Sequence, residues 1–180
     1  MTASGKKLIA MGITGGIAAY KAADLCSTLA KKYDVQVIMT ESSQEFVGEL
    51  TFRTLSRRTV MRELFAIPAE VRPAHVALAD EADLFIVVPA TANFLAKYAN
   101  GIADDALSTF AATWQGKTIL APAMNPKMWS QAACQRNVAF LKEQGVIFAG
   151  PVSGRVACGA DGVGRMMDVS EILDIIEQNI

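Results

Sequence analysis

Asn125 and Met128 stand in residues 122–129, PAMNPKMW, which follow an apolar run and carry a proline on either side of the asparagine. The run 118–121 predicts a buried strand, and Asn125 with Pro126 predicts the N-cap and the first residue of a helix. An amide and free backbone N–H groups at a helix start suit a carboxylate or another anionic oxygen. The same pattern also fits plain capping beside a core methionine and tryptophan, so this segment alone leaves both interpretations open.

A glycine-rich segment near the C-terminus holds a second group of reactive side chains. Residues 154–166 contain four glycines, two arginines and one cysteine in 13 residues. Arg155 and Arg165 can bind phosphate or carboxylate, and Cys158 is a candidate reactive thiol. Long irregular loops in compact domains are usually functional or disordered, so we expect residues 151–168 to form a mobile, irregular flap that delivers Cys158 on closure. A flexible surface loop with an incidental thiol is the alternative.

His75 is the sole histidine, and the pKa of an imidazole suits general acid–base catalysis near neutral pH. A solitary histidine is more often a surface residue or a satisfied core residue. Asp80 and Asp83, which follow it, fit exposed helix charges equally well. His75 is therefore a candidate catalytic residue on its type alone.

The turn after the first apolar run, residues 14–17, brings backbone N–H groups and a helix start to one place, which can cradle a phosphate. Thr40 and Ser42 add hydroxyl groups after the second run, at a strand end where ligands tend to bind. The turn matches neither G-x-G-x-x-G nor the Walker A pattern, which disfavours a nucleotide triphosphatase. A tight βα turn that needs glycine for close packing is the alternative.

Apolar runs alternate with segments of helical periodicity along the chain, the pattern of parallel βαβ units. We therefore predict an α/β fold with a doubly wound, Rossmann-like parallel sheet, helices on both faces, and one domain over residues 1–180. The expected strands are residues 8–13, 35–39, 84–88, 118–121 and 146–149, and the expected helices are residues 17–32, 45–58, 94–99, 104–113, 126–144 and 171–179. Residues 59–72 are expected to be irregular, and a capping box from Asp168 to Glu171 to open the last helix.

The composition excludes several classes of partner. The 180 residues include 17 basic and 18 acidic side chains, for a net charge of −1, so neither nucleic acid nor an anionic membrane is an expected partner. The chain has no apolar stretch long enough for a membrane span and no signal-type apolar region, which favours a cytoplasmic location. Cys26, Cys134 and Cys158 lack metal-ligand spacing, so we expect reduced thiols and no metal site, with Cys26 and Cys134 buried in the core.

Four motifs in the right order make nearly the whole chain resemble the flavin-dependent cysteine decarboxylases. The family's Pro-Ala/Ser-Ser/Thr-Ala-Asn pattern stands at residues 89–93, and its Pro-x-Met-Asn-x-x-Met-Trp pattern stands at residues 122–129. The family's active-site histidine falls on His75, and the cysteine of its substrate-clamping flap falls on Cys158. The glycine-rich setting of that cysteine is most similar to the members that act in coenzyme A biosynthesis.

The resemblance implies FMN as the cofactor and phosphopantothenoylcysteine as the small-molecule substrate. The implied FMN-binding residues are Gly15, Gly16, Ile17, Thr40, Glu41, Ser42, Thr91, Ala92, Asn93, Phe94 and Ala123, and the implied substrate-binding residues are Asn125, Met128, Arg155 and Arg165. Phe94 departs from the threonine of many relatives, so we expect an apolar contact there. Family members are trimers or trimer-based dodecamers, which implies a homo-oligomer whose site takes His75 and Asn125 from different subunits.

The implied reaction is FMN-dependent decarboxylation of phosphopantothenoylcysteine to phosphopantetheine. Oxidation of the substrate cysteine to a thioaldehyde creates the electron sink for loss of CO2, which gives an enethiol. The family assigns the final reduction to the flap cysteine, here Cys158, while Asn125 holds the carboxylate and His75 assists the first oxidation. The alternatives are a peptidyl-cysteine decarboxylase or a flavin prenyltransferase of the same fold, a non-catalytic phosphatase-inhibiting relative, and a generic nucleotide-binding domain.

Overall fold

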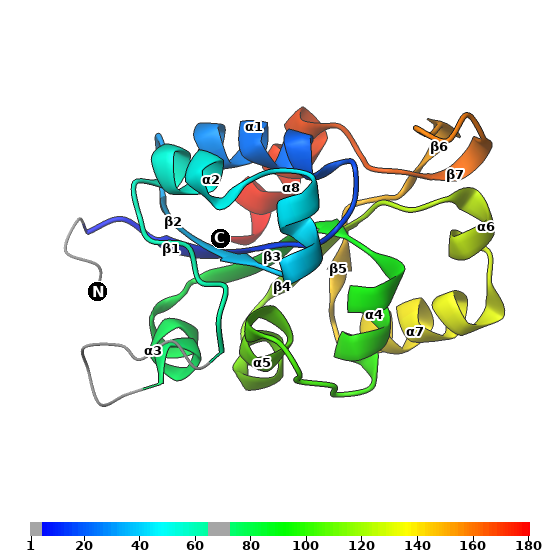
Figure 1. Cartoon of the computed structure of the whole chain (residues 1–180). Helices are drawn as coiled ribbons and strands as arrows, with labels where there is room; N and C mark the ends of the chain where they lie inside the picture. Colours follow the sequence, from blue (N-terminus) through cyan, green and yellow to red (C-terminus); the bar gives the residue numbers. More distant parts are fainter. Residues whose placement is uncertain (1–4, 65–72) are drawn as a thin grey trace.

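A five-stranded parallel sheet forms the centre of the protein (Figure 1), whose computed structural model describes residues 5–64 and 73–180. The strands are β1 (Leu8–Ile13), β2 (Asp34–Met39), β3 (Leu84–Ala90), β4 (Thr118–Pro122) and β5 (Ile147–Phe148), in the order β2-β1-β3-β4-β5. Every pair is parallel, and every residue of β1, β3 and β4 is buried, as expected of strands covered on both faces. The prediction of a doubly wound parallel sheet is confirmed.

Helices cover both faces of the sheet, each over its own apolar cluster (Figure 1). One face carries α1 (Ala19–Leu29), α2 (Glu49–Ser56) and α8 (Val169–Asn179), and the other carries α3 (Ala74–Glu81), α4 (Ala92–Ala99), α5 (Ala106–Thr113) and α7 (Ala132–Glu143). Phe52 and Ile172 are fully buried on the first face, and Leu95 and Phe110 on the second. The strand order reverses between β1 and β3, which is where open α/β sheets place ligands, at the carboxyl ends of their strands.

Two predicted helices differ from the structure in their extent. The helix expected over residues 126–144 is two helices, α6 (Pro126–Trp129) and α7, with Ser130 as the C-cap of the first and Gln131 as the N-cap of the second. No glycine or proline stands at this break, and the apolar residues keep their helical spacing across it. The sequence therefore predicted one continuous helix. The helix expected over residues 45–58 is shorter, α2 over Glu49–Ser56, and a 3-10 turn, η1 (Glu41–Glu45), precedes it.

The expectation of an irregular flap over residues 151–168 is wrong in its conformation. The segment forms an antiparallel hairpin of β6 (Val152–Arg155) and β7 (Asp161–Arg165), which lies beside α6 (Figure 1). Gly154 and Gly162 face each other in the hairpin with φ of 150° and 146°, a conformation that other residues rarely adopt. Glycine lowers strand propensity, so a sequence pattern rich in it favoured a loop.

Three smaller expectations have mixed outcomes. The capping box of Asp168 and Glu171 is present and opens α8 at Val169. Asp83 is not merely an exposed helix charge, because its carboxylate accepts the N–H of Leu8, the first residue of β1, at 2.7 Å. In the segment expected to be irregular, Met61 forms an isolated bridge to β2, while residues 65–72 lie outside the described part of the chain. Among the described residues, no helix combines the length and apolarity needed to cross a membrane.

Candidate active site

The start of α6 fixes the orientation of the Asn125 amide. β4 ends at Pro122, and Asn125 caps α6 as predicted, with its Oδ1 accepting the Lys127 N–H at 2.8 Å and Pro126 as the first helical residue. The amide nitrogen is left to donate elsewhere, and it donates to the Cys158 sulfur at 3.1 Å. The two residues that the sequence marked most strongly, 33 positions apart, are therefore in direct contact.

The hairpin is attached to this junction by its second strand, β7. The Met124 N–H donates to the Gly164 carbonyl at 3.0 Å, and a Cβ added at Gly164 would overlap the Met124 carbonyl oxygen. A Cβ added at Gly162 would lie 3.0 Å from the Pro126 Cβ. These two glycines therefore let the backbone of β7 lie directly against residues 124–126, a close approach that a side chain would prevent.

Cys158 lies exposed at the tip of the hairpin, between β6 and β7. The tip is closed by two backbone hydrogen bonds, from the Val156 N–H to Ala160 at 2.9 Å and from the Gly159 N–H to Val156 at 2.8 Å. The backbone N–H of Ala160 and the amide of Asn125 hold the pKa of the Cys158 thiol below its usual value, because both donate to the charged form. Burial instead raises the pKa of the Cys26 thiol to about 12, as expected of a core residue.

Asp168 connects the base of the hairpin to two helices. It caps α8, while its Oδ1 lies 3.3 Å from the Lys21 Nζ of α1 and its Oδ2 lies 3.6 Å from Nη2 of Arg165. The Arg165 side chain also lies across Gly154, since a Cβ added there would be 3.2 Å from Nε. Of the two arginines predicted to bind substrate, Arg165 thus already has a carboxylate partner, and Arg155 is exposed on β6.

The turns that follow β1, β2, β3 and β4 converge at the carboxyl edge of the sheet. Thr14, 2% exposed, donates its hydroxyl to the Pro89 carbonyl at 2.7 Å and accepts the Thr91 N–H at 3.1 Å, which joins the first and third turns. A Cβ added at Gly15 would lie 2.5 Å from the Ser42 Cβ, so glycine is needed where the first and second turns meet. The Ala123 N–H donates to Ala90 at 3.2 Å and joins the third and fourth turns.

The residues predicted to bind the cofactor lie on these turns, with one unexpected orientation. Ile17 is 57% exposed, and Glu41, Ser42 and Asn93 are also exposed. Phe94 is 2% exposed, and its ring stacks on Tyr98 at 5.9 Å between centroids, so the expected apolar contact from this ring to a ligand is not available. The position sits on the inner face of α4, which the motif alone did not reveal.

His75 does not meet the other predicted catalytic residues within one chain. It lies in α3, partly buried, and Figure 1 shows α3 at the opposite end of the molecule from α6 and the β6–β7 hairpin. Asn125 and Cys158 are therefore brought together by the fold, and His75 is not. Thr14 is a buried polar residue for which no role was predicted, although its place at a strand end was a usable signal.

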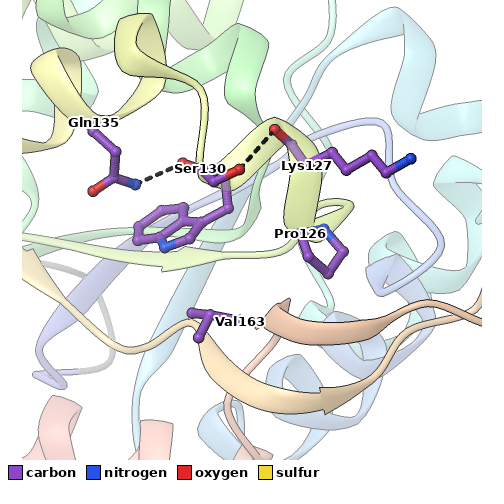
Figure 2. Close-up of a pocket in the computed structure, with 6 residues that line it drawn as sticks. Pro126, Lys127, Ser130, Gln135 and Val163 are labelled. Carbon is purple, nitrogen blue, oxygen red and sulfur yellow. Dashed lines mark hydrogen bonds between the residues drawn. The ribbon is translucent and has the colours of Figure 1, made fainter.

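A groove of about 590 Å³ opens beside α6 (Figure 2). Apolar side chains line much of it, with the cationic Lys127 at one side; the lining residues are Pro126, Lys127, Trp129, Ser130, Gln135 and Val163. Trp129, expected to be a core residue, is only partly buried and lines this groove. Residues from α6, α7 and β7 meet here, so no single segment of sequence indicated it.

Comparison with known proteins identifies the family. The family described as Flavoprotein matches residues 1–180. The chain is 40% identical over 178 residues to the coenzyme A biosynthesis bifunctional protein CoaBC of Vibrio vulnificus, an alignment covering 98% of this chain and 44% of that protein. This chain thus spans less than half the length of the curated relatives it matches.

Solved structures give the same result. A PPC decarboxylase, a cysteine-to-serine mutant complexed with pantothenoylaminoethenethiol, superposes with a TM-score of 0.89 at 27% identity, over 96% of this chain and 97% of that one. The FMN-dependent cysteine decarboxylase SpaF superposes with a TM-score of 0.82 at 28% identity, over 97% and 95%. The family predicted from the four motifs is confirmed, and the chain belongs to the flavoproteins.

Proposed function

We propose that this protein catalyses the FMN-dependent decarboxylation of phosphopantothenoylcysteine to phosphopantetheine, a step of coenzyme A biosynthesis. The observation that carries the proposal is the Cys158 thiol, exposed and hydrogen-bonded at 3.1 Å to the Asn125 amide where α6 begins. A carboxylate-binding amide and a thiol in contact suit a substrate that carries both a carboxylate and a sulfur. The similarity to a PPC decarboxylase at 27% identity supports the same substrate.

The converging turns fit FMN. α1 begins at Ala19 without a side-chain cap, and the Ala19 and Lys21 N–H groups donate to the Gly16 and Ala18 carbonyls, so a phosphate would be bound by the N–H groups of the preceding turn and by the positive end of the helix. The close contact of Gly15 with Ser42 brings the Thr40 and Ser42 hydroxyls beside that helix start. Gly15, Gly16, Ile17, Thr40, Glu41 and Ser42 would hold the phosphate and ribityl chain, while Thr91, Ala92, Asn93 and Ala123 would border the ring. Phe94 would act through its backbone, because its side chain lies in the core.

The chain's residues divide the remaining work. When bound, FMN would supply the reversible two-electron chemistry of this reaction. Asn125 donates to the carboxylate, and the half-exposed Met128 borders the same pocket. His75 accepts or orients the thiol proton as the thioaldehyde forms. Cys158 supplies the proton when the enethiol is reduced to phosphopantetheine.

The groove beside α6 would receive the pantothenoyl arm. Pro126 borders both Asn125 and the groove, so a ligand held by its carboxylate at Asn125 can extend along Pro126, Val163 and Trp129. These apolar side chains suit the branched, uncharged middle of the arm. The phosphate at its end would bind Lys127 or Arg155, since Arg165 is paired with Asp168.

The distance between α3 and α6 within one chain supports a homo-oligomer. If His75 acts on a substrate held by Asn125, it must come from a neighbouring copy, as in a trimer or a trimer-based dodecamer. Such an enzyme would work in the cytoplasm, where its thiol stays reduced. Removal of the trimer contact should therefore abolish turnover even when each chain is folded.

Incubation of the FMN-loaded protein with phosphopantothenoylcysteine tests the proposal. Release of CO2 and appearance of phosphopantetheine, followed by mass spectrometry, is the expected result. A peptide ending in cysteine and a prenyl phosphate serve as parallel substrates, because turnover of either one in place of phosphopantothenoylcysteine would assign the alternative activity. Tight FMN binding without turnover of any substrate would indicate a non-catalytic relative.

A further inference from the structure

The Asn125 amide has one NH2 group, which carries two N–H donors, and two prospective acceptors. Its oxygen is committed to the Lys127 N–H at 2.8 Å, which fixes which end of the amide faces outward. The nitrogen can only donate, and it donates to the Cys158 sulfur at 3.1 Å. In the proposed function the same nitrogen must donate to the substrate carboxylate. A carboxylate and a sulfur bound to the same nitrogen would lie side by side, and the charge of the carboxylate opposes the thiolate form of Cys158 at this position.

We infer that Asn125 holds Cys158 in the substrate-free enzyme, that the substrate carboxylate displaces the thiol from the amide, and that Cys158 returns only after CO2 has left. The displacement rests on the proposed function, whereas the holding contact is independent of it. Asn125 is thus a positioning residue for Cys158 as well as the residue that binds the carboxylate. The exchange of the thiol for the carboxylate at the Asn125 amide, and its reversal, place loss of CO2 before the step in which Cys158 acts.

The hairpin confines the required movement to its tip. β7 is fixed along residues 124–126 by the Met124–Gly164 hydrogen bond and by the close approach of Gly162 to Pro126. Residues 156–160 have two backbone–backbone hydrogen bonds among themselves. Within the described part of the chain, the Asn125–Cys158 contact is the single hydrogen bond between this tip and the rest of the protein. Loss of that bond therefore releases the tip without detaching the strand.

The exchange keeps the thiol in the form that each stage needs. While Asn125 donates to sulfur, the pKa of Cys158 is held below its usual value by Ala160 and Asn125. A carboxylate in that place removes one donor and adds a negative charge, so Cys158 stays protonated until the carboxylate is gone. The protonated thiol is the form that can supply a proton to the enethiol.

Titration of Cys158 in FMN-loaded protein tests the holding contact. The ¹³Cβ shift of labelled cysteine reports the thiol midpoint, with Cys158→Ser to assign the signal and the buried Cys26 and Cys134 as internal references. Asn125→Asp keeps the acceptor that caps α6 but replaces the donor by a charge, and should raise the midpoint by about one pH unit or more. Asn125→Ser, which keeps a capping oxygen too short to reach sulfur, should raise it in the same direction.

Gln131→Glu is the matched control. Gln131 is exposed, makes no side-chain cap hydrogen bond, and lies just beyond α6, and the substitution is the same change from amide to carboxylate. The Cys158 midpoint in this variant should therefore stay within about 0.3 pH units of the parent value. The other charged residues of the elements that meet at Cys158 are unchanged in every variant; they are Arg155, Asp161, Arg165 and Lys127. Equal midpoints in the parent, Asn125→Asp and Asn125→Ser would overturn the holding contact.

Two inert ligands test the displacement. Phosphopantothenoylalanine keeps the carboxylate and lacks the thiol, and phosphopantothenoyl ethylamide lacks both. With binding of each measured by calorimetry, the first should raise the Cys158 midpoint and the second should leave it in place. If both bind and shift the midpoint equally, the exchange is wrong while the substrate class stands. If neither binds, the proposed function fails, and the ligand-free titration still decides whether Asn125 holds Cys158.

Discussion

Substitution of Gly15 by alanine should separate the two turns that form the proposed phosphate cradle. A Cβ at this position would lie 2.5 Å from the Ser42 Cβ and 2.9 Å from the Ser42 carbonyl carbon and oxygen. Unstrained carbon contacts lie at about 3.5–4.0 Å, so the first and second turns must move apart by about 1 Å. Overpacking of this kind costs about 1–3 kcal/mol of unfolding free energy.

Gly16→Ala is the matched control in the same turn. Its nearest neighbour would be Thr91 Cγ2 at 3.7 Å, an ordinary van der Waals contact, so the added methyl group has room. The smaller conformational freedom of alanine in the unfolded chain stabilises by about 0.4–1 kcal/mol at a compatible site. The two variants should therefore differ by about 2 kcal/mol, with Gly15→Ala the less stable.

Urea denaturation of the FMN-free proteins measures this difference directly. A fluorescence titration with FMN should then show weaker binding to Gly15→Ala, by about tenfold for each 1.4 kcal/mol of lost contact with the displaced residues 40–42. Equal unfolding free energies for the two variants would refute the steric argument. Normal FMN affinity in a clearly destabilised Gly15→Ala would instead show that residues 40–42 do not bind the cofactor.

Four further substitutions test the site. Cys158→Ser should lose CO2 normally and stop before reduction, so mass spectrometry should find an unsaturated or oxidised product; normal release of phosphopantetheine would exclude the role given to this thiol. Asn125→Asp should keep the flavin absorbance and lose CO2 release, because two carboxylates repel, and unchanged turnover would rule out carboxylate binding there. Thr14→Val strands two buried backbone groups and should cost about 2 kcal/mol in urea unfolding, against little change for the exposed Thr54→Val; equal effects would contradict the bridging role. Lys127→Gln should raise KM for phosphopantothenoylcysteine by about tenfold and leave KM for unphosphorylated pantothenoylcysteine unchanged, whereas parallel changes would argue against a phosphate contact.

The three central strands, β1, β3 and β4, were predictable because they are buried on both faces and consist mostly of apolar residues. β1 was predicted at its observed bounds, and the strand predicted over residues 118–121 covers the first four residues of β4. The break between α6 and α7 was not predictable, because Ser130 and Gln131 interrupt the helix through their backbone angles and leave the apolar period intact. Periodicity records which residues are buried, and it is insensitive to a turn between two helices on the same face.

The site was predictable where local sequence determines local geometry. Asn125 followed by proline specifies an N-cap, and that cap is what orients the amide toward Cys158. The contact with Cys158 depends on how β7 lies against residues 124–126, which involves two segments and missing side chains at Gly162 and Gly164. Phe94 was assigned to the cofactor site from its place in a motif, but its ring is buried in the core. A motif position alone therefore does not show which way a side chain points.

The glycines of the hairpin were interpreted from the sequence as a sign of a mobile, irregular flap, but in the structure two of them allow close packing of β7. A flexible flap would lose considerable backbone entropy on closing, at about 1–2 kcal/mol for each residue ordered. Gly162 and Gly164 instead allow β7 to lie against α6 and its preceding residues, so in this arrangement the strand is ordered without a bound substrate. Only the turn around Cys158 remains to be moved, and one hydrogen bond to Asn125 restrains it. A substrate carboxylate that replaces this bond can therefore shift the thiol at small cost, which makes a single amide an effective control point for the reaction.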